Sequence, residues 1–305
     1  MNTHRVFACL GLISLFLSCA SVNSQTAESL YPVKEISDLD YYSGPDADSD
    51  KHKLDLYLPE GLKAYPTMLW IHGGAWIVGG RKQEAELARR FAERGVGMVV
   101  ISYRLSPGTW QDPKLTEGIQ HPEHIRDCIR ALKWTIENGR QYGIDTDKII
   151  ASGYSAGGHL SALMATDPSY LKEAGLDTSA LLGAVPIAGA YDMVAYYHAH
   201  LEGNGRKVAD GHVLGVFGDL ETAKKASPTE YLYETQIPML VISETDTYGY
   251  TRVYENILDK TSIDHIRFYH DRSRNHRALF FALMNKESCD TRDEIIQYVN
   301  QLAEK

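Results

Sequence analysis

Continuously apolar runs separated by helix-forming segments are the main pattern of this chain. Runs without charged residues are typical of strands that are covered on both faces of a sheet. Helical periodicity predicts helices between them, at Gln83 to Arg94, after Pro122, after Ser155 and at Tyr250 to Leu258. Strands that alternate with helices predict an α/β fold, with a mostly parallel central sheet and helices on both faces. The expected strands are Thr67 to Ile71, Val96 to Tyr103, Ile149 to Ala151, Leu182 to Ile187, Pro238 to Ile242 and Ile263 to Tyr269.

Other segments depart from this pattern. His52 to Pro59 alternates apolar and polar residues, which predicts a half-exposed strand near a sheet edge. Residues 104–121 are rich in turn formers and are expected to form a long loop at the edge of a pocket. Residues 191–234 show little periodicity, and an insertion of this length usually serves as a lid or a pocket wall. Thr291 and Glu294 have the spacing of a capping box and predict the start of the last helix.

A Gly-x-Ser-x-Gly sequence around Ser155 follows an apolar run and precedes a helix rich in small residues. In this context the sequence is typical of a nucleophile elbow, whose sharp turn leaves no room for side chains at Gly153 and Gly157. The turn exposes the Ser155 hydroxyl and directs the N–H group of Ala156 towards a bound carbonyl oxygen. An ordinary strand-to-helix glycine turn can have the same sequence, so the assignment depends on the rest of the chain.

Polar segments follow the buried strands at the sheet edge where the active sites of α/β proteins lie. Residues 72–76 (His-Gly-Gly-Ala-Trp) follow one strand, and the Ser155 turn follows another. Asp246 comes after the strand that begins at Pro238, and His276 lies in a later polar loop. The chain order Ser, Asp, His is that of the catalytic triads of α/β-hydrolases.

Several of these motifs resemble those of carboxylesterases of the α/β-hydrolase superfamily. The resemblance is closest to a group similar to feruloyl and carbohydrate esterases, kynurenine formamidases and isoprenylcysteine methylesterases, and it covers about residues 52–300. The chain departs from hormone-sensitive-lipase-like esterases at Ala75, where those have a third glycine. The motifs that carry the resemblance are residues 72–76 (HGGAW), 103–107 (YRLSP), 121–127 (HPEHIRD), 153–159 (GYSAGGH) and 226–228 (ASP).

The resemblance implies an α/β-hydrolase fold and hydrolysis of a carboxylic ester through an acyl-enzyme intermediate. Ser155 is the expected nucleophile, His276 the base, and Asp246 the acid that orients His276. An amidase or formamidase that uses the same triad is the alternative. The rival acids are Asp192 and Glu244, and the rival bases are His265 and His270.

Backbone N–H groups are expected to form the oxyanion hole, which stabilises the negative charge of the tetrahedral intermediate. The expected donors are Gly74, Ala75 and Ala156. Because these are main-chain groups, Ala75 keeps its donor although its methyl group narrows the acyl side of the site. The side chains expected to line the substrate pocket are Trp76, Trp110 and Tyr154.

Composition and charge limit the partners of the chain. The chain has 31 Lys and Arg residues against 40 Asp and Glu residues, a net charge of −9, which argues against nucleic acid as a partner. The pairs His198-x-His200 and His121-x-x-His124 lack a third ligand at a recognised spacing, so no metal is expected. No cofactor is expected, and the predicted partner is a small-molecule ester. A non-catalytic binding protein on the same fold usually lacks a triad member, whereas this chain has all three.

Residues 1–24 have the pattern of a secretory signal peptide, in which Arg5 precedes the apolar run Val6 to Leu17. This run is shorter than the roughly 18 residues that a membrane span needs. We therefore expect an exported protein, periplasmic or secreted, with one domain over residues 25–305. A lipid anchor at Cys19 is the less favoured alternative.

Two cysteines lie outside the leader. Cys128 falls in a predicted helix after Pro122, and Cys289 falls just before the last helix. In the expected fold these helices cover opposite faces of the sheet, too far apart for a disulfide. Both cysteines are therefore expected to be unpaired thiols.

Overall fold

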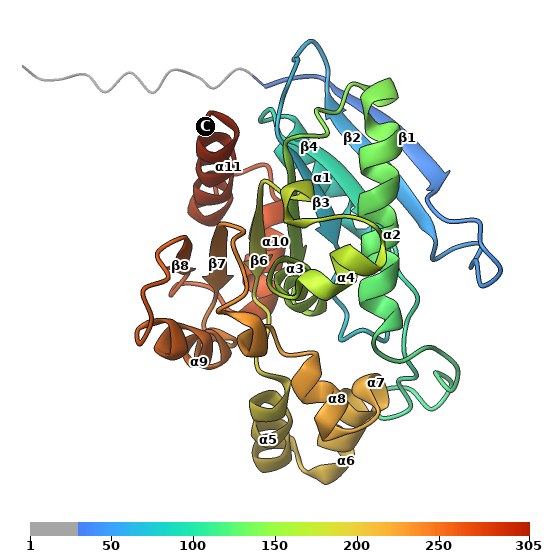
Figure 1. The fold of residues 1–305 in the computed structure, drawn as a ribbon, viewed down its shortest axis with the longest axis vertical. Helices are drawn as coiled ribbons and strands as arrows, with labels where there is room; N and C mark the ends of the chain where they lie inside the picture. The colour runs from blue at the N-terminus through green and yellow to red at the C-terminus, as the bar shows by residue number, and fades with distance from the viewer. Residues whose placement is uncertain (1–29) are drawn as a thin grey trace, which may run out of the picture.

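The computed structural model describes residues 30–305, and the predicted leader with Cys19 lies outside the described residues (Figure 1). Eight strands form one sheet in the order β1-β2-β4-β3-β5-β6-β7-β8. Strands β3 to β8 run parallel, whereas β2 is antiparallel to both β1 and β4. This confirms the predicted mostly parallel sheet. The strands are β1 Val33–Asp40, β2 Lys53–Pro59, β3 Thr67–Ile71, β4 Gly97–Ile101, β5 Ile149–Tyr154, β6 Gly183–Ile187, β7 Met239–Ser243 and β8 Ile266–His270.

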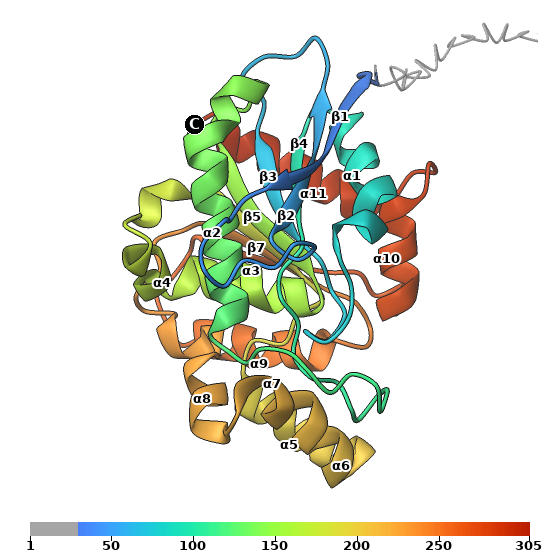
Figure 2. The same cartoon turned by 90° about the vertical axis from the view of Figure 1, so that its right-hand side faces the viewer.

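Helices cover both faces of the sheet, as predicted. Figure 2 shows α2 on one side of the strands and α1 and α10 on the other. The main helices are α1 Ala85–Ala92, α2 Glu123–Asn138, α3 Ala156–Thr166, α4 Pro168–Glu173, α9 Tyr248–Leu258, α10 His276–Met284 and α11 Asp290–Ala303. Short 3-10 helices lie at Arg81–Glu84, Gly139–Tyr142, Thr178–Ala180 and Pro228–Tyr231.

Each face of the sheet has its own hydrophobic core because successive strand residues point to opposite sides. In β3, Leu69 and Ile71 pack in the core under α2 and α3, and Met68 and Trp70 pack in the core under α1, α10 and α11. All strand residues of β3, β4 and β5 are buried. The continuously apolar runs therefore identified these strands correctly.

Cys128 and Cys289 lie in the two different cores. Cys128 belongs to α2 and is buried in the core on that face, whereas Cys289, at the start of α11, is buried in the core on the other face. Both cysteines are unpaired. The central sheet separates them, which is the arrangement expected from the sequence.

The edge of the sheet differs from the prediction. Strand β1 (Val33–Asp40) was not predicted, and it covers β2, which is buried rather than half-exposed. The charged residue Asp55 gave β2 the alternating sequence pattern of a strand with one face in solvent. Its carboxylate is 1% exposed and accepts a hydrogen bond from the backbone N–H of Asp38 at 2.7 Å. It also pairs with Arg81 at 3.2 Å and with Lys82 at 3.2 Å, so a polar position of the pattern is a buried ion-pair site.

Residues 191–234 are largely helical, although their sequence shows little periodicity. Figures 1 and 2 show helices α5 to α8 as a group beyond one end of the sheet. Asp192 caps the first of them by accepting a hydrogen bond from the N–H of Ala195 at 2.9 Å. The elements are α5 Met193–Asn204, α6 Arg206–Ala209, a π-helical turn at Asp210–Leu214, α7 Gly215–Phe217 and α8 Leu220–Lys225.

The predicted capping box does not start the last helix. Cys289 occupies the N-cap position of α11, and Thr291 lies inside the first turn. The Thr291 hydroxyl donates to Asp271 Oδ2 at 2.8 Å, which links α11 to the loop after β8. A tertiary hydrogen bond has therefore replaced the local one that the spacing indicated.

We predict that Arg81→Met lowers the free energy of unfolding by about 3 kcal/mol, because it leaves Asp55 buried with less compensation. Chemical denaturation measures this change. The matched control is Lys225→Met, which removes the exposed pair with Glu221 and should cost less than about 1 kcal/mol. Equal effects of the two substitutions would show that the Asp55 site contributes no more than a surface ion pair.

Candidate active site

Ser155 occupies a strained turn between β5 and α3. Its backbone has φ 57° and ψ −116°, a conformation that non-glycine residues rarely adopt. A Cβ atom at Gly153 would lie 2.5 Å from the carbonyl oxygen of Ile71, and one at Gly157 would lie 1.9 Å from the same atom. The two glycines are therefore required for the turn to pack against the end of β3, as the nucleophile-elbow pattern predicts.

The loop after β3 also has a special backbone. Gly74, Ala75 and Trp76 have positive φ angles of 110°, 53° and 61°. The Gly74 carbonyl accepts hydrogen bonds from the N–H groups of Ile77 and Val78, each at 3.0 Å, which closes the loop. These three consecutive left-handed residues turn the chain sharply beside Ser155.

The predicted oxyanion donors lie around Ser155. Ala75 and Ala156 line one cavity with Ser155, and Gly74 lines an adjoining cavity with it. In the described part of the chain the N–H groups of Gly74 and Ala75 make no hydrogen bond. Ala156 is the first residue of α3, where an N–H group has no partner within the helix. Free donors at this position can bind a developing oxyanion.

The buried side chain of His72 packs beneath the loop after β3, on its protein side. Its ring is buried, stacks on Tyr103 with 4.2 Å between ring centroids, and places Nδ1 2.6 Å from the carbonyl oxygen of Gly73. Burial lowers the pKa of His72 to about 4, so the imidazole is neutral at pH 7. These contacts give His72 a structural role in holding the loop.

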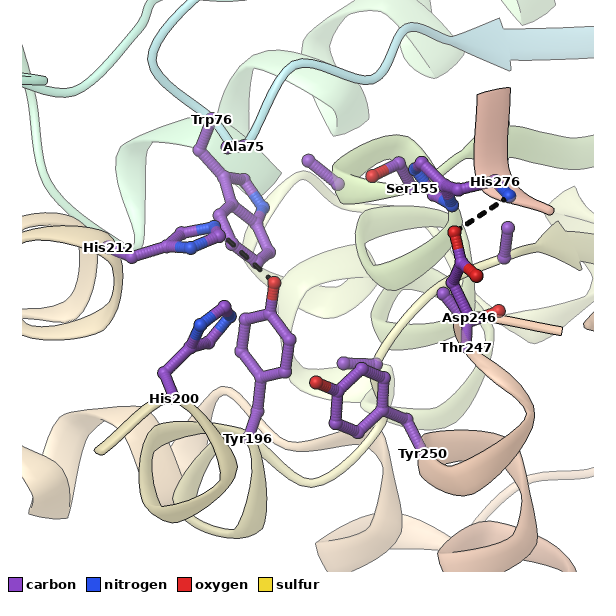
Figure 3. A pocket seen from close by; sticks show the side chains of 13 residues that line it. Ala75, Trp76, Ser155, Tyr196, His200, His212, Asp246, Thr247, Tyr250 and His276 are labelled. Atoms are coloured by element: carbon purple, nitrogen blue, oxygen red, sulfur yellow. Dashed lines mark hydrogen bonds between the residues drawn. The ribbon is translucent and has the colours of Figure 1, made fainter. Parts of the chain in front are cut away.

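The carboxylate on the His276 ring belongs to Glu244. Glu244 Oε1 lies 2.9 Å from His276 Nδ1, and the Glu244 side chain is fully buried. This differs from the expectation that Asp246 orients the ring. Asp246 Oδ2 instead accepts a hydrogen bond from the backbone N–H of His276 at 3.1 Å, which Figure 3 shows as a dashed line. The longer Glu244 side chain, directly after β7, reaches the ring from inside the protein.

The turn at Glu244 and Asp246 and the side chain of Tyr154 together hold His276. The N–H group of Asp246 donates to Glu244 Oε2 at 2.5 Å, so the turn that carries Asp246 also fixes the Glu244 carboxylate. Tyr154 donates its hydroxyl to the His276 carbonyl oxygen at 2.6 Å. The His276 main chain is thus held by Tyr154 and Asp246, and its ring is held by Glu244.

The other rival residues have separate contacts. Asp192 caps α5. His270 Nδ1 lies 2.7 Å from the Ser243 hydroxyl, and its other ring nitrogen lies 3.5 Å from Glu255. Neither His270 nor His265 lines a cavity that contains Ser155.

Two cavities meet at Ser155, Ala75 and His276. The smaller cavity, of about 350 Å³, also contains Trp76, and the larger cavity, of about 590 Å³, also contains Tyr154 and Trp110. In the part of the chain that the structure describes, Ser155 and His276 share these cavities without a direct hydrogen bond. Catalytic hydrogen bonds are often long before a substrate binds.

The insertion supplies the far wall of the smaller cavity. Figure 3 shows Tyr196, His200 and His212 of the insertion, together with Trp76 of the loop after β3, opposite Ser155 and His276. The length and weak periodicity of residues 191–234 indicated a pocket wall, but they did not single out His212, and Tyr250 lies outside this segment, in α9. Burial lowers the pKa of His212 to about 3, so this ring is neutral at pH 7.

The described residues contain no cluster of three or more His, Cys, Asp or Glu side chains that could hold a metal ion. His121 Nε2 contacts the hydroxyl of Tyr170 at 3.0 Å, and His124 Nε2 contacts that of Ser106 at 2.9 Å. Among residues 30–305 no helix is long and apolar enough to cross a membrane.

The fold and the arrangement of the elbow, the loop after β3 and the histidine define an α/β-hydrolase. Residues 54–248 match the model of the family described as BD-FAE, and the chain belongs to this family.

Curated relatives match over part of their length. The probable carboxylic ester hydrolase LipM of Mycobacterium tuberculosis is 39% identical over 132 residues, which are 42% of this chain and 28% of the relative. The probable isoprenylcysteine alpha-carbonyl methylesterase ICMEL1 of Oryza sativa subsp. japonica is 31% identical over 189 residues, 58% of this chain and 40% of the relative. The chain thus matches less than half the length of these relatives.

Solved structures share the fold at low sequence identity. Esterase B from Lactobacillus Rhamnosis has a TM-score of 0.72 at 20% identity, with 89% of this chain and 86% of the esterase covered. A truncated carbohydrate esterase from gut microbiota has a TM-score of 0.69 at 19% identity, with 92% of this chain and 99% of the other covered. These similarities confirm the predicted α/β-hydrolase fold.

The buried carboxyl group of Glu84 should make the stability of the protein depend on pH. Burial raises its pKa from 4.5 to about 7, so the folded state holds this proton more tightly than the unfolded state. The wild type should therefore lose stability as the pH rises from about 4.5 to about 7, by up to about 3 kcal/mol from this group. Glu84→Gln should remove this loss and be the more stable protein at pH 8. Unfolding curves at pH 4.5 and pH 8 measure the difference, and equal pH dependence in both proteins would contradict the prediction.

Proposed function

We propose that this chain is a serine carboxylesterase in which Ser155, His276 and Glu244 form the catalytic triad. The observation that carries the proposal is the buried Glu244 carboxylate on Nδ1 of a histidine that shares a cavity with the strained Ser155. A nucleophile, a base and a residue that orients the base are the parts that acyl transfer needs. The named relatives include a probable carboxylic ester hydrolase and esterases, which supports the same reaction.

In this mechanism Ser155 Oγ attacks the ester carbonyl while His276 Nε2 accepts the hydroxyl proton. Glu244 keeps the other ring proton on Nδ1, so that Nε2 is free to act as a base, and it stabilises the imidazolium that forms. The tetrahedral intermediate collapses as the C–O bond to the alcohol breaks, and His276 returns the proton to the departing alcohol. Water then attacks the acyl-enzyme by the same route, which releases the acid and restores Ser155.

The oxyanion of each tetrahedral intermediate would bind the free N–H groups around Ser155. Ala75 and Ala156 line the same cavity as the nucleophile, and Gly74 lines the adjoining one. Loss of one such donor typically costs about 3 to 4 kcal/mol of transition-state stabilisation. The strained backbone of the loop after β3 would hold these donors in place before substrate arrives.

We further propose a carbohydrate or another small polar acyl ester as the substrate. The smaller cavity combines the aromatic side chains of Trp76, Tyr196 and Tyr250 with the polar side chains of His200 and His212. A wall of aromatic surfaces with a few hydrogen-bonding side chains suits a small polar ester such as a sugar ester. Comparing acetylated glycans with p-nitrophenyl esters of different acyl length tests this choice, and a matched pair of ester and anilide tests the amidase alternative.

Ser155→Ala should leave a folded protein whose ester hydrolysis falls by about three or more powers of ten. The substitution removes the only atom that can form the acyl-enzyme in this mechanism. Initial rates with p-nitrophenyl acetate measure the effect, and circular dichroism checks the fold. Turnover close to that of the wild type would refute the serine mechanism.

Glu244→Gln should lower kcat by up to about 10⁴-fold near neutral pH, because an amide favours the wrong tautomer of the histidine ring. Asp246→Asn is the matched control. Its amide oxygen can still accept the His276 N–H, so the loss should stay below about tenfold. The opposite ranking would return the acid role to Asp246 and exclude Glu244.

A further inference from the structure

The larger cavity contains a buried acid that the proposed mechanism does not use. Glu84 lies at the start of α1 and is 4% exposed, yet it lines the same cavity as Ser155. Much of the rest of this cavity is apolar, with Val78 and Phe280 among its walls. Glu84 is therefore an ionisable group facing a space that a substrate can enter.

Only one oxygen of Glu84 has a partner. Oε2 accepts a hydrogen bond from Trp70 Nε1 at 3.0 Å, and Oε1 makes no hydrogen bond within the described residues. No basic side chain pairs with Glu84 there, whereas the equally buried Asp55 pairs with both Arg81 and Lys82. Burying an uncompensated carboxyl group costs free energy.

A structural role does not account for this cost. The Trp70 indole needs one acceptor, and a neutral amide at position 84 would supply it without burying an ionisable group. Buried acids that are kept at a cost beside a cleft are candidates for ligand binding. The free oxygen of Glu84 is available to accept a hydrogen bond from a molecule in the cavity.

We propose that Glu84 is a specificity-determining residue whose Oε1 accepts a hydrogen bond from a hydroxyl group on the part of the ester that occupies the larger cavity. This inference rests on the proposed esterase function, since it assigns a substrate group to that site. The group is an uncharged hydroxyl and not an ammonium, because Arg277 lines the same cavity and would repel a second cation.

Other titratable groups lie near Glu84, and the test must distinguish their effects on activity from the effect of Glu84. Tyr154, His276 and Arg277 line the same cavity, and Tyr103 interacts with the charge of Glu84. The ratio of kcat/KM for two substrates of the same enzyme cancels the effect of every group that acts equally on both substrates. Burial raises the pKa of Glu84 to about 7, so comparisons at pH 8 examine its carboxylate form.

The test compares esters that end in a hydroxyl with esters that end in a methoxy group, over a series of chain lengths on the acyl side and on the alcohol side. A methoxy oxygen accepts hydrogen bonds but cannot donate one to a carboxylate. At pH 8 the wild type should prefer the hydroxyl compound in kcat/KM at the chain length that reaches Glu84. Glu84→Gln should lower this preference by about tenfold or more, because its amide keeps the Trp70 bond and offers a donor that the methoxy oxygen can accept.

Glu86→Gln is the matched control, since Glu86 is an exposed carboxylate of α1 that lines neither cavity. It should leave the hydroxyl preference unchanged. Binding of the same ester pairs to Ser155→Ala, measured by calorimetry, gives the comparison without turnover, so a failure of the esterase proposal is distinguishable from a failure of this one. An unchanged preference in Glu84→Gln, or tighter binding of an ammonium-ended ester than of the hydroxyl ester, would overturn the inference.

Discussion

A contact between main-chain atoms of β3 and α3 holds the nucleophile and the oxyanion loop together. The carbonyl oxygen of Ile71 lies so close to Gly157 that a Cβ atom there would be 1.9 Å away. Ile71 ends β3 and leads directly into the loop at residues 72–76, whereas Gly157 follows Ser155 in the first turn of α3, just after the neighbouring strand β5. The distance between the Ser155 hydroxyl and the N–H donors of the loop after β3 is therefore set by two segments of main chain in direct contact, without a side chain between them.

The histidine is positioned by a different principle. Its main chain is held by Tyr154 and Asp246, and its ring is held by Glu244. Elements β5, α10 and the turn after β7 all contribute to this arrangement, and none of these contacts is local in sequence. Several independent hydrogen bonds fix one side chain more narrowly than a single one, which is what a base that must reach Ser155 requires.

The sequence predicted those parts of the fold that local patterns determine. Buried parallel strands produce apolar runs, and the elbow produces its glycine spacing, so β3, β4, β5 and the Ser155 turn could be located. Strand β1 could not, because most of its residues are exposed and its pairing with β2 is tertiary. The acid could not be chosen either. Glu244 and Asp246 lie in one turn, and only the direction of each side chain separates them.

The stacking of Trp110 on His212 links the two halves of the site. Their ring centroids are 4.8 Å apart and their planes are nearly parallel. Trp110 comes from the loop at 104–121 and lines the larger cavity, whereas His212 comes from the insertion and lines the smaller one. Because one ring of the stacked pair lines each cavity, the shapes of the two cavities depend on each other. Replacing either ring would change the shape of both cavities, whereas Ser155, His276 and Glu244 are held by other contacts. Substrate selection and the chemical step therefore depend on different parts of this protein.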